Sequence, residues 1–225
     1  MGAGRYTRFR APAPADAPGA CTIALVPADA PLILGSQSPR RKELLGRLGI
    51  PYAVRFAEID ETPRAAETPS AYLERIALAK MAAVCAVVAQ GSRVLVADTL
   101  VVAPDGAILG KPADDDHART MLQRLAGSSH HVATRFALAE AFAGRARTLA
   151  HVQTVTTGVT FRALSASEIA DYVATGEGRD KAGSYAVQGL AAAFVERIDG
   201  SFTNVVGLPL SELSVALRRL GWLGA

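Results

Sequence analysis

The sequence predicts a mixed α/β domain, and two features of the chain carry this prediction. A short apolar run at residues 32–34, typical of a strand buried on both faces, is followed directly by the start of a helix. Two β-rich segments, 131–142 and 150–164, are expected to pair through a turn near Gly144. Because no GxGxxG motif follows a strand and no GxxxxGKS/T motif occurs, the sequence excludes the doubly wound dinucleotide-binding folds.

Length and composition restrict the class of protein. The chain has 225 residues, half of them hydrophobic, which is enough to bury a core in one domain or in one domain with two lobes. A formal net charge of +3 suits an anionic small ligand and does not by itself indicate nucleic acid binding. The 2 cysteines and 4 histidines show neither disulfide nor zinc-site spacing. No apolar run approaches the ~20 residues that span a bilayer.

The segment 1–30 is rich in Ala and Pro and lacks the apolar stretch of a signal peptide. It is predicted to be a disordered N-terminal extension, with an extra edge strand as the alternative, and 31–225 to form the folded domain. None of the candidate site residues lies in it, so deletion of residues 1–28 is expected to spare activity.

The stretch from Pro31 to Leu45 organises the rest of the chain. Ser38 stands where a helix N-cap is expected, Pro39 at the first helical position, and the helix should end near Gly49. The cations at 40–42 then fall in the first turn, where the helix dipole disfavours positive charge. They indicate a phosphate or carboxylate ligand, or, equally compatible with this stretch alone, a capped helix with solvated arginines.

A second strand is predicted at 52–56, and it leads into a cluster of three carboxylates, Glu58, Asp60 and Glu61. Such a cluster is by default a solvated turn. The alternative is that one or two of its members hold a cation.

A long helix is predicted from Thr68 to about Gln90. Its apolar stripe includes Ile76 and Val87, and the helical period places Lys80 in the middle of that stripe. A lysine in this position either extends to solvent or points at a ligand beneath the helix, and we favour the ligand.

The segment 93–102 is an apolar strand interrupted by Asp98 and Thr99. A buried aspartate is costly unless it is hydrogen-bonded, metal-bound or protonated, so this interruption indicates function more than a local bulge.

A turn at 104–106 leads to Lys111, which lies between a glycine and a proline and is therefore expected in an extended loop that can approach a ligand. The three aspartates at 114–116 look like metal ligands but precede a helix at 118–125. Acidic residues are typical of a helix start, so we interpret them as capping residues.

The last part of the chain contains a capping box at 165–168, a helix to Thr175 and a glycine-rich loop at 176–189. Arg179, Lys181 and Gln188 in this loop are polar groups of the kind that close over a nucleotide. A short strand around 185–187 is expected within the loop. A strand at 192–198, a hairpin turn at 199–200, a loop at 201–207 and a helix at 208–220 follow.

Five short motifs occur in an order that resembles the Maf-like nucleoside triphosphate pyrophosphatases over residues 32–220. They are Ser36-Gln-Ser-Pro-Arg-Arg, Ala97-Asp-Thr, Gly110-Lys-Pro, Asp180-Lys-Ala-Gly-Ser-Tyr-Ala-Val-Gln-Gly and Asn204-Val-Val-Gly-Leu-Pro. The departures from the family pattern are Gly35, where an alanine is usual, and Ala191-Ala192, where a glycine is often found.

The resemblance implies an elongated mixed sheet with two lobes around a deep cleft, related to the inosine triphosphate pyrophosphatase architecture. It also implies a cytoplasmic, commonly dimeric enzyme that releases pyrophosphate from nucleotides with Mg²⁺ or Mn²⁺. Asp98 is then the general base, and Glu61 and Asp98 are the metal ligands. The residues implied to bind substrate are Ser36, Arg40, Arg41, Lys80, Thr99, Lys111, Lys181 and Gln188.

The identities of Arg40, Thr99 and Gln188 resemble the branch of this family that acts on dTTP and UTP. The alternatives are a pyrophosphatase for 7-methyl-GTP or ITP, and a non-catalytic nucleotide or nucleic-acid binding protein in septation control. A pure binding protein gains nothing from a carboxylate such as Asp98 beside a triphosphate, which favours the enzyme. No nucleic acid and no membrane is expected as a partner.

Overall fold

The computed structural model describes residues 31–223 of the chain. The predicted N-terminal extension, 1–30, lies outside the described residues. Within them, no helix is long and apolar enough to cross a membrane.

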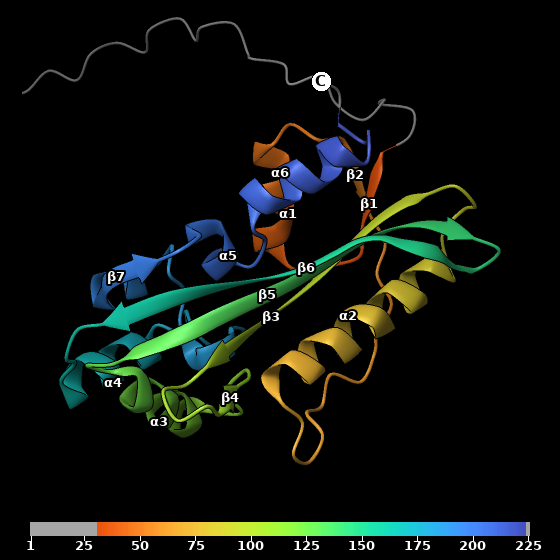
Figure 1. The fold of residues 1–225 in the computed structure, drawn as a ribbon. Helices are drawn as coiled ribbons and strands as arrows, with labels where there is room; N and C mark the ends of the chain where they lie inside the picture. Colours follow the sequence, from red (N-terminus) through yellow and green to blue (C-terminus); the bar gives the residue numbers. More distant parts are fainter. Residues whose placement is uncertain (1–30, 224–225) are drawn as a thin grey trace, which may run out of the picture.

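One mixed sheet runs the length of the molecule (Figure 1). Its strands follow the order β2-β1-β3-β5-β6-β7, and β4 pairs with β3 at one end. The pairs β1–β2 and β1–β3 are parallel, and the other pairs are antiparallel. The strands are β1 (Leu32–Leu34), β2 (Tyr52–Val54), β3 (Arg93–Val102), β4 (Ile108–Leu109), β5 (Ser129–Phe142), β6 (Arg145–Phe161) and β7 (Val195–Asp199).

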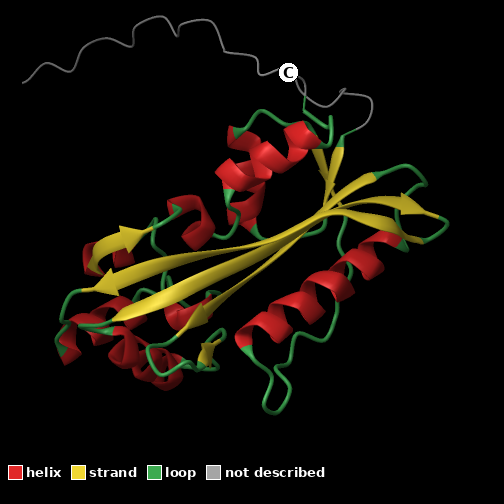
Figure 2. Ribbon diagram, in the orientation of Figure 1, coloured by secondary structure: helices red, strands yellow, loops and turns green. Residues whose placement is uncertain are grey.

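Helices cover both faces of this sheet (Figure 2). One helix, α2, packs on one face, and α1 and α6 gather with β1 and β2 at one end of the other face, while α3 and α4 lie at the opposite end. The predicted mixed α/β fold is confirmed. The helices are α1 (Pro39–Arg47), α2 (Pro69–Cys85), α3 (Asp115–Leu125), α4 (Ala166–Ala174), α5 (Phe202–Val206) and α6 (Leu210–Arg219), with two 3₁₀ turns, η1 (Ala182–Ser184) and η2 (Leu190–Phe194).

Alternate residues of β3 serve two different cores. Val94 and Val96 pack beneath α2, whereas Leu95 and Ala97 belong to the large core on the opposite face. Because side chains alternate across a strand, Asp98 is directed to the α2 face and its neighbour to the other face.

The edge of β3 is only partly paired. Ile33 and Leu34 of β1 pair with its residues 94–95, and β4 pairs with residues 101–102, while the register of the described strands gives residues 96–100 no partner on that side. The interruption begins where β1 ends at Leu34, and the last contact on this side is the N–H of Gly35, which donates to the Leu95 carbonyl at 2.8 Å. This gap gives access to both faces of β3 at one point.

Gly35 also fits a space that no side chain can enter without a shift. A Cβ atom built there would lie 2.8 Å from Val96 Cγ1 and 2.9 Å from Val84 Cγ2. Contacts under ~3 Å are repulsive in a close-packed interior. The glycine therefore lets β1 approach α2 and β3 at the start of the Ser36 turn.

Most element boundaries match the prediction, and the helix α2 is the main exception in the first half. It ends at Cys85 instead of about Gln90, and Val87, assigned to its apolar stripe, is 61% exposed. The chain must leave the helix early because the N–H of Gly91 already donates to the Ala141 carbonyl of β5, at 2.8 Å.

The predicted strand at 185–187 does not form. Tyr185 and Val187 are buried, and the Tyr185 hydroxyl hydrogen-bonds to His130 Nε2 at 2.8 Å. The alternation of Tyr185 and Val187 in the sequence therefore reflects the burial of these two side chains and not the hydrogen bonding of a strand.

Three further predictions in the C-terminal part are wrong. The strand at 192–198 begins only at Val195, because 190–194 forms the 3₁₀ turn η2. The turn at 199–200 leads into a helix and not into a hairpin partner. The expected loop at 201–207 contains α5, which begins at Phe202 after the N-cap residue Ser201, whose hydroxyl accepts the N–H of Asn204 at 3.2 Å.

Candidate active site

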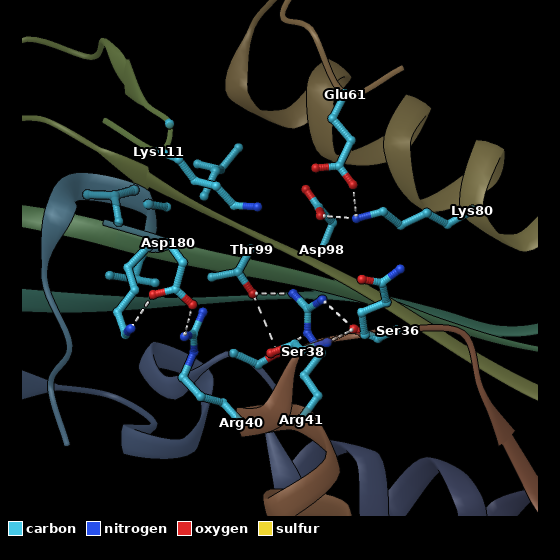
Figure 3. Close-up of a pocket in the computed structure, with 18 of the residues that line it drawn as sticks. Ser36, Ser38, Arg40, Arg41, Glu61, Lys80, Asp98, Thr99, Lys111 and Asp180 are labelled. Atoms are coloured by element: carbon cyan, nitrogen blue, oxygen red, sulfur yellow. Dashed lines mark hydrogen bonds and ion pairs between the residues drawn. The ribbon is translucent and has the colours of Figure 1, made fainter. Parts of the chain in front are cut away.

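A cavity of about 1040 Å³ opens at the gap in the β3 edge. It is lined by the start of α1, the loop before α2, the middle of β3, the loop after β4 and the loop 176–189. Figure 3 shows the charged side chains converging on it. Ten of the residues predicted from the sequence line this cavity: Ser36, Arg40, Arg41, Glu61, Lys80, Asp98, Thr99, Lys111, Lys181 and Gln188. Arg179 does not line it and instead pairs with Asp115 of α3.

Lys80 lies between two carboxylates on the α2 side of the cavity (Figure 3). Its Nζ is 2.6 Å from Asp98 Oδ1 and 2.7 Å from Glu61 Oε1. The Asp98 side chain is only 9% exposed, so this ammonium offsets much of the cost of burying its charge. The predicted inward direction of Lys80 is confirmed.

Glu61 stays ionised in this arrangement. Partial burial of its carboxyl group acts to raise its pKa, but the hydrogen bond and the positive charge of Lys80 outweigh burial and hold the pKa below its usual value, with a smaller contribution from Lys111. The carboxylate is therefore available as an anionic ligand at neutral pH.

The two carboxylates fit a divalent cation of the Mg²⁺ type. Their oxygens both lie within 2.7 Å of the same lysine nitrogen, so a single small volume of the cavity is within reach of both. Among residues 31–223 no cluster of three or more His, Cys, Asp or Glu side chains forms a complete protein cage. Mg²⁺ is commonly held by one or two carboxylates together with substrate phosphates and water, which is the donor set available here.

Arg41 is the buried cation on the other side of β3. Arg41 lies on the buried face of α1 together with Leu44 and Leu45. Its neighbour Arg40 points instead toward Asp180 at the mouth of the cavity. The Nε of Arg41 donates to the Gly207 carbonyl at 2.9 Å, and its two terminal nitrogens donate to Ser36 Oγ at 3.1 Å and Thr99 Oγ1 at 3.0 Å. Burial lowers the pKa of Arg41 from its usual value, and the nearby charge of Asp98 opposes that effect.

Ser36 keeps its proton free for a ligand. Its Oγ accepts two hydrogen bonds, one from Arg41 and one from the N–H of Ser38 at 3.2 Å. A serine hydroxyl has two lone pairs and one proton, so the O–H remains as a donor toward the cavity. Ser38 is the N-cap residue of α1 as predicted, but its side chain makes no capping hydrogen bond.

An ion pair joins the two ends of the cavity mouth. Arg40 of α1 is 3.3 Å from Asp180 Oδ2 in the loop 176–189. Lys181 contacts the same aspartate and also donates to the Glu177 carbonyl oxygen at 2.8 Å. The charges of these cations lower the pKa of Asp180 despite its partial desolvation.

The sequence assigns no role to Asp180, which only opens one of the five motifs, and does not single out Glu177. The Glu177 carboxylate accepts the N–H of Leu190 at 2.9 Å, the N–H of Ala191 at 3.3 Å and the Tyr172 hydroxyl at 2.9 Å. It thereby closes the base of the loop that carries Lys181 and Gln188. No local pattern signals such a partner, because its donors lie up to 14 residues away.

The capping interpretation of the aspartates at 114–116 is supported for Asp114. Its carboxylate accepts the N–H of His117 at 2.7 Å at the start of α3, where Asp115 and Asp116 occupy the first turn. These three aspartates do not line the cavity that holds Asp98.

Comparison with known proteins gives a consistent family. A family model described as "Maf-like protein" matches residues 31–220. Two curated relatives, each named dTTP/UTP pyrophosphatase, come from Citrifermentans bemidjiense and Desulfotalea psychrophila. The first is 47% identical over 193 residues, 86% of this chain and 97% of the relative. The second is 49% identical over 185 residues, 82% of this chain and 92% of the relative.

A solved structure, a nucleoside-triphosphatase (dITP/XTP pyrophosphatase) from Mycobacterium abscessus, is a much weaker match. It is 12% identical, has a TM-score of 0.32 and covers 58% of this chain and 72% of that chain.

Proposed function

Because the chain belongs to the Maf-like protein family, we propose that it hydrolyses dTTP and UTP to the nucleoside monophosphate and pyrophosphate. The relatives that carry this name align over more than four fifths of the chain. The observation that carries the proposal is the cavity itself, in which a buried carboxylate, Asp98, faces a group of cations. Cations suit a triphosphate, and the carboxylate suits the removal of a proton from water.

In the proposed reaction, water attacks the α-phosphorus and pyrophosphate leaves. Asp98 takes one proton from the attacking water, the new P–O bond forms, and the bond to the bridging oxygen of pyrophosphate breaks. Arg41, Lys111 and Lys181 stabilise the negative charge that grows on the phosphate oxygens. Ser36 donates its free hydroxyl proton to a phosphate oxygen.

Glu61 and Asp98 are proposed to hold a divalent cation, Mg²⁺ or Mn²⁺. When bound, such an ion supplies positive charge to the phosphate oxygens and orients the triphosphate. Lys80 then contributes by keeping the Glu61 carboxylate ionised and by holding both carboxylates near one point of the cavity.

The pyrimidine preference rests on the relatives' names and on Gln188. This residue lies on the cavity wall, and its amide offers one donor and one acceptor. Uracil and thymine present an acceptor, a donor and an acceptor along one edge, so an amide can match two neighbouring atoms. Gln188 is exposed, so a base that leaves its amide unmatched forfeits about 0.5–1.5 kcal/mol for each hydrogen bond that is not made.

The test is pyrophosphate release by the purified full-length protein, measured as kcat/KM for dTTP, UTP, CTP, GTP, 7-methyl-GTP and ITP with Mg²⁺. We expect dTTP and UTP to lead. Leadership by ITP or 7-methyl-GTP would refute the pyrimidine assignment alone, and nucleotide binding without release of pyrophosphate would favour a binding protein.

The same assay tests Asp98. Asp98→Asn should reduce turnover at least ~10²–10⁴-fold, because it removes a general base and a metal ligand. Asp116→Asn is the matched control, since Asp116 lies on α3 outside the cavity. Normal turnover in a folded Asp98→Asn protein would contradict its catalytic role.

A homodimer and a cytoplasmic location remain predictions from the family resemblance. Light scattering after size-exclusion chromatography tests the first, and fractionation of cells that express the protein tests the second.

A further inference from the structure

Arg41 is held by a chain of hydrogen bonds that continues behind the cavity. Its terminal nitrogen donates to Thr99 Oγ1, which is 2.9 Å from Thr134 Oγ1 on β5. Thr134 is fully buried and its hydroxyl donates to the Asn204 carbonyl of α5 at 3.0 Å. The chain therefore runs from the guanidinium through two threonines to the backbone of α5.

Counting hydroxyl protons shows which group donates at each step of this series of hydrogen bonds. The Asn204 carbonyl can only accept, so the single proton of the Thr134 hydroxyl is used there. The Thr99 hydroxyl has two acceptors, Thr134 Oγ1 at 2.9 Å and the Gly207 carbonyl at 3.5 Å, and the shorter contact assigns its proton to Thr134. With its proton directed at Thr134 and one lone pair taken by Arg41, the Thr99 hydroxyl is not a donor toward the cavity.

Arg41 depends on such neutral acceptors because it has no carboxylate ion-pair partner among residues 31–223. Three of its five N–H groups are used by Ser36, Thr99 and Gly207, and two remain. A buried guanidinium with unused N–H groups is suited to a phosphate, provided that its plane is fixed before the ligand arrives.

The end of α5 completes the support. Gly207 has a φ of 126°, a conformation that favours glycine, and a Cβ atom built there would lie 3.5 Å from Thr99 Oγ1 and 3.8 Å from Arg41 Nε. The Asn204 side chain anchors the same segment, since its amide donates to the Val132 carbonyl and to Thr157 Oγ1, both at 2.9 Å. This explains why the Asn204–Pro209 motif accompanies a site from which Asn204 itself is absent.

We propose that Thr134 is a positioning residue for triphosphate binding and that Thr99 acts through Arg41 on the phosphates and not as a reader of the base. The proposal deepens the proposed function, on which its triphosphate ligand rests. It predicts that loss of either hydroxyl weakens binding of all triphosphates to the same degree, including one that has no base.

The experiment is calorimetric titration of the full-length protein with inorganic tripolyphosphate, without divalent cation so that no turnover occurs. Thr99→Val should weaken binding about 10-fold and Thr134→Val about 3-fold or more, because each removes one link that orients the guanidinium. Thr134→Ser, which restores the hydroxyl, should bind like the unmodified protein. Thr156→Val, on the exposed part of β6, is the matched control.

The kinetic readout separates the two roles of Thr99. In Thr99→Val we expect KM to rise equally for UTP and GTP, with their kcat/KM ratio unchanged. Unchanged tripolyphosphate affinity together with an altered UTP-to-GTP ratio would overturn the proposal, as would Thr134→Ser failing to recover affinity. If Thr134→Val does not fold, Thr99→Val, at a partly exposed site, decides alone. If the threonine variants bind tripolyphosphate more weakly but the unmodified protein hydrolyses no nucleotide, the proposed function is refuted and this inference stands.

Discussion

Lys80 is the residue on which the charge balance of the site depends. Two carboxylates face its ammonium group, one of them almost fully buried, and the lysine side chain is itself only 14% exposed. Without this cation, the negative charges of Asp98 and Glu61 would repel one another with no positive charge between them. The sequence alone suggests that Lys80→Met leaves the melting temperature nearly unchanged, and the ion pairs revise that expectation.

Lys80→Met should lower both turnover and stability at pH 7. We expect a loss of roughly 1–3 kcal/mol in the free energy of unfolding, since a buried carboxylate loses its partner while the apolar stem is retained. Mg²⁺ should recover part of this loss by binding between the carboxylates. Denaturant titrations with and without Mg²⁺ measure these changes in the free energy of unfolding. If Lys80→Met is as stable as the unmodified protein in the absence of Mg²⁺, the ion pairs of Lys80 do not stabilise the fold as described.

For single residues, the sequence predicts which side chains belong to the site more successfully than it predicts the contacts of those side chains. Asp98 and Lys80 are detectable because each interrupts an apolar pattern. Arg40 and Arg41 are adjacent and look alike in the sequence, yet one forms an ion pair at the cavity mouth and the other is buried. That difference depends on where Gly207 and Asp180 lie, and both are more than 130 positions away.

Among the elements, the loop 176–189 depends most on a single side chain. The Glu177 carboxylate binds two backbone N–H groups at the start of η2 and one hydroxyl of α4. Gly189 lies against it so closely that an added Cβ would be 2.1 Å from the carboxylate. The loop is thereby closed at its base while its tip carries Lys181.

Glu177→Gln should loosen this loop. A glutamine replaces one acceptor oxygen with an NH₂ group that faces donors, so at least one of the three hydrogen bonds is lost. We expect KM for dTTP to rise several-fold, with a smaller effect on kcat, and faster cleavage within 176–189 in limited proteolysis. Glu196→Gln, an exposed glutamate on β7, is the control, and an equal protease pattern in both variants argues against the closure.

Element types are well predicted where local signals are strong. The capping box at Ser165 and the hairpin of β5 and β6 both form as expected. The helix α5 is not predicted although its Ser201 cap is a local signal. The end of α2 and the 3₁₀ turn η2, by contrast, are set by contacts with distant strands or side chains. Period and propensity do not contain that information.

For the molecule as a whole, one buried histidine links folding to pH. His130 is fully buried, and burial lowers its pKa from 6.5 to about 4, with a smaller contribution from His131. Between these two pH values His130 is therefore neutral in the folded state and protonated in the unfolded chain. Stability from this source is intact above pH 6.5 and falls as the pH decreases toward 4.

His130→Gln should remove this pH dependence. Between pH 7 and pH 4.5 the unmodified protein should lose about 2–3 kcal/mol more in its free energy of unfolding than the variant, because only the unfolded histidine is protonated over that range. Denaturant unfolding at both pH values measures the difference. Equal losses in the two proteins would show that His130 is protonated in the folded state.

The position of the cavity is a property of the whole sheet and could not be read from the chain. The sequence predicts the strands, but the site depends on β1 and β4 leaving the middle of the β3 edge unpaired, so that groups from both faces meet there.

Gly35 carries a consequence for how this protein can change over time. Because an alanine there would collide with both Val84 and Val96, the three positions share one volume. Gly35→Ala should be harmful alone, less harmful when Val84 or Val96 is smaller, and free of both collisions only when both are smaller, whereas a smaller residue at either position alone leaves a hole. A double-mutant cycle on unfolding free energy would show this as non-additivity. The order in which positions 35, 84 and 96 can change is therefore restricted. The residues that an ancestor carries at these positions decide which substitution its descendants can accept first.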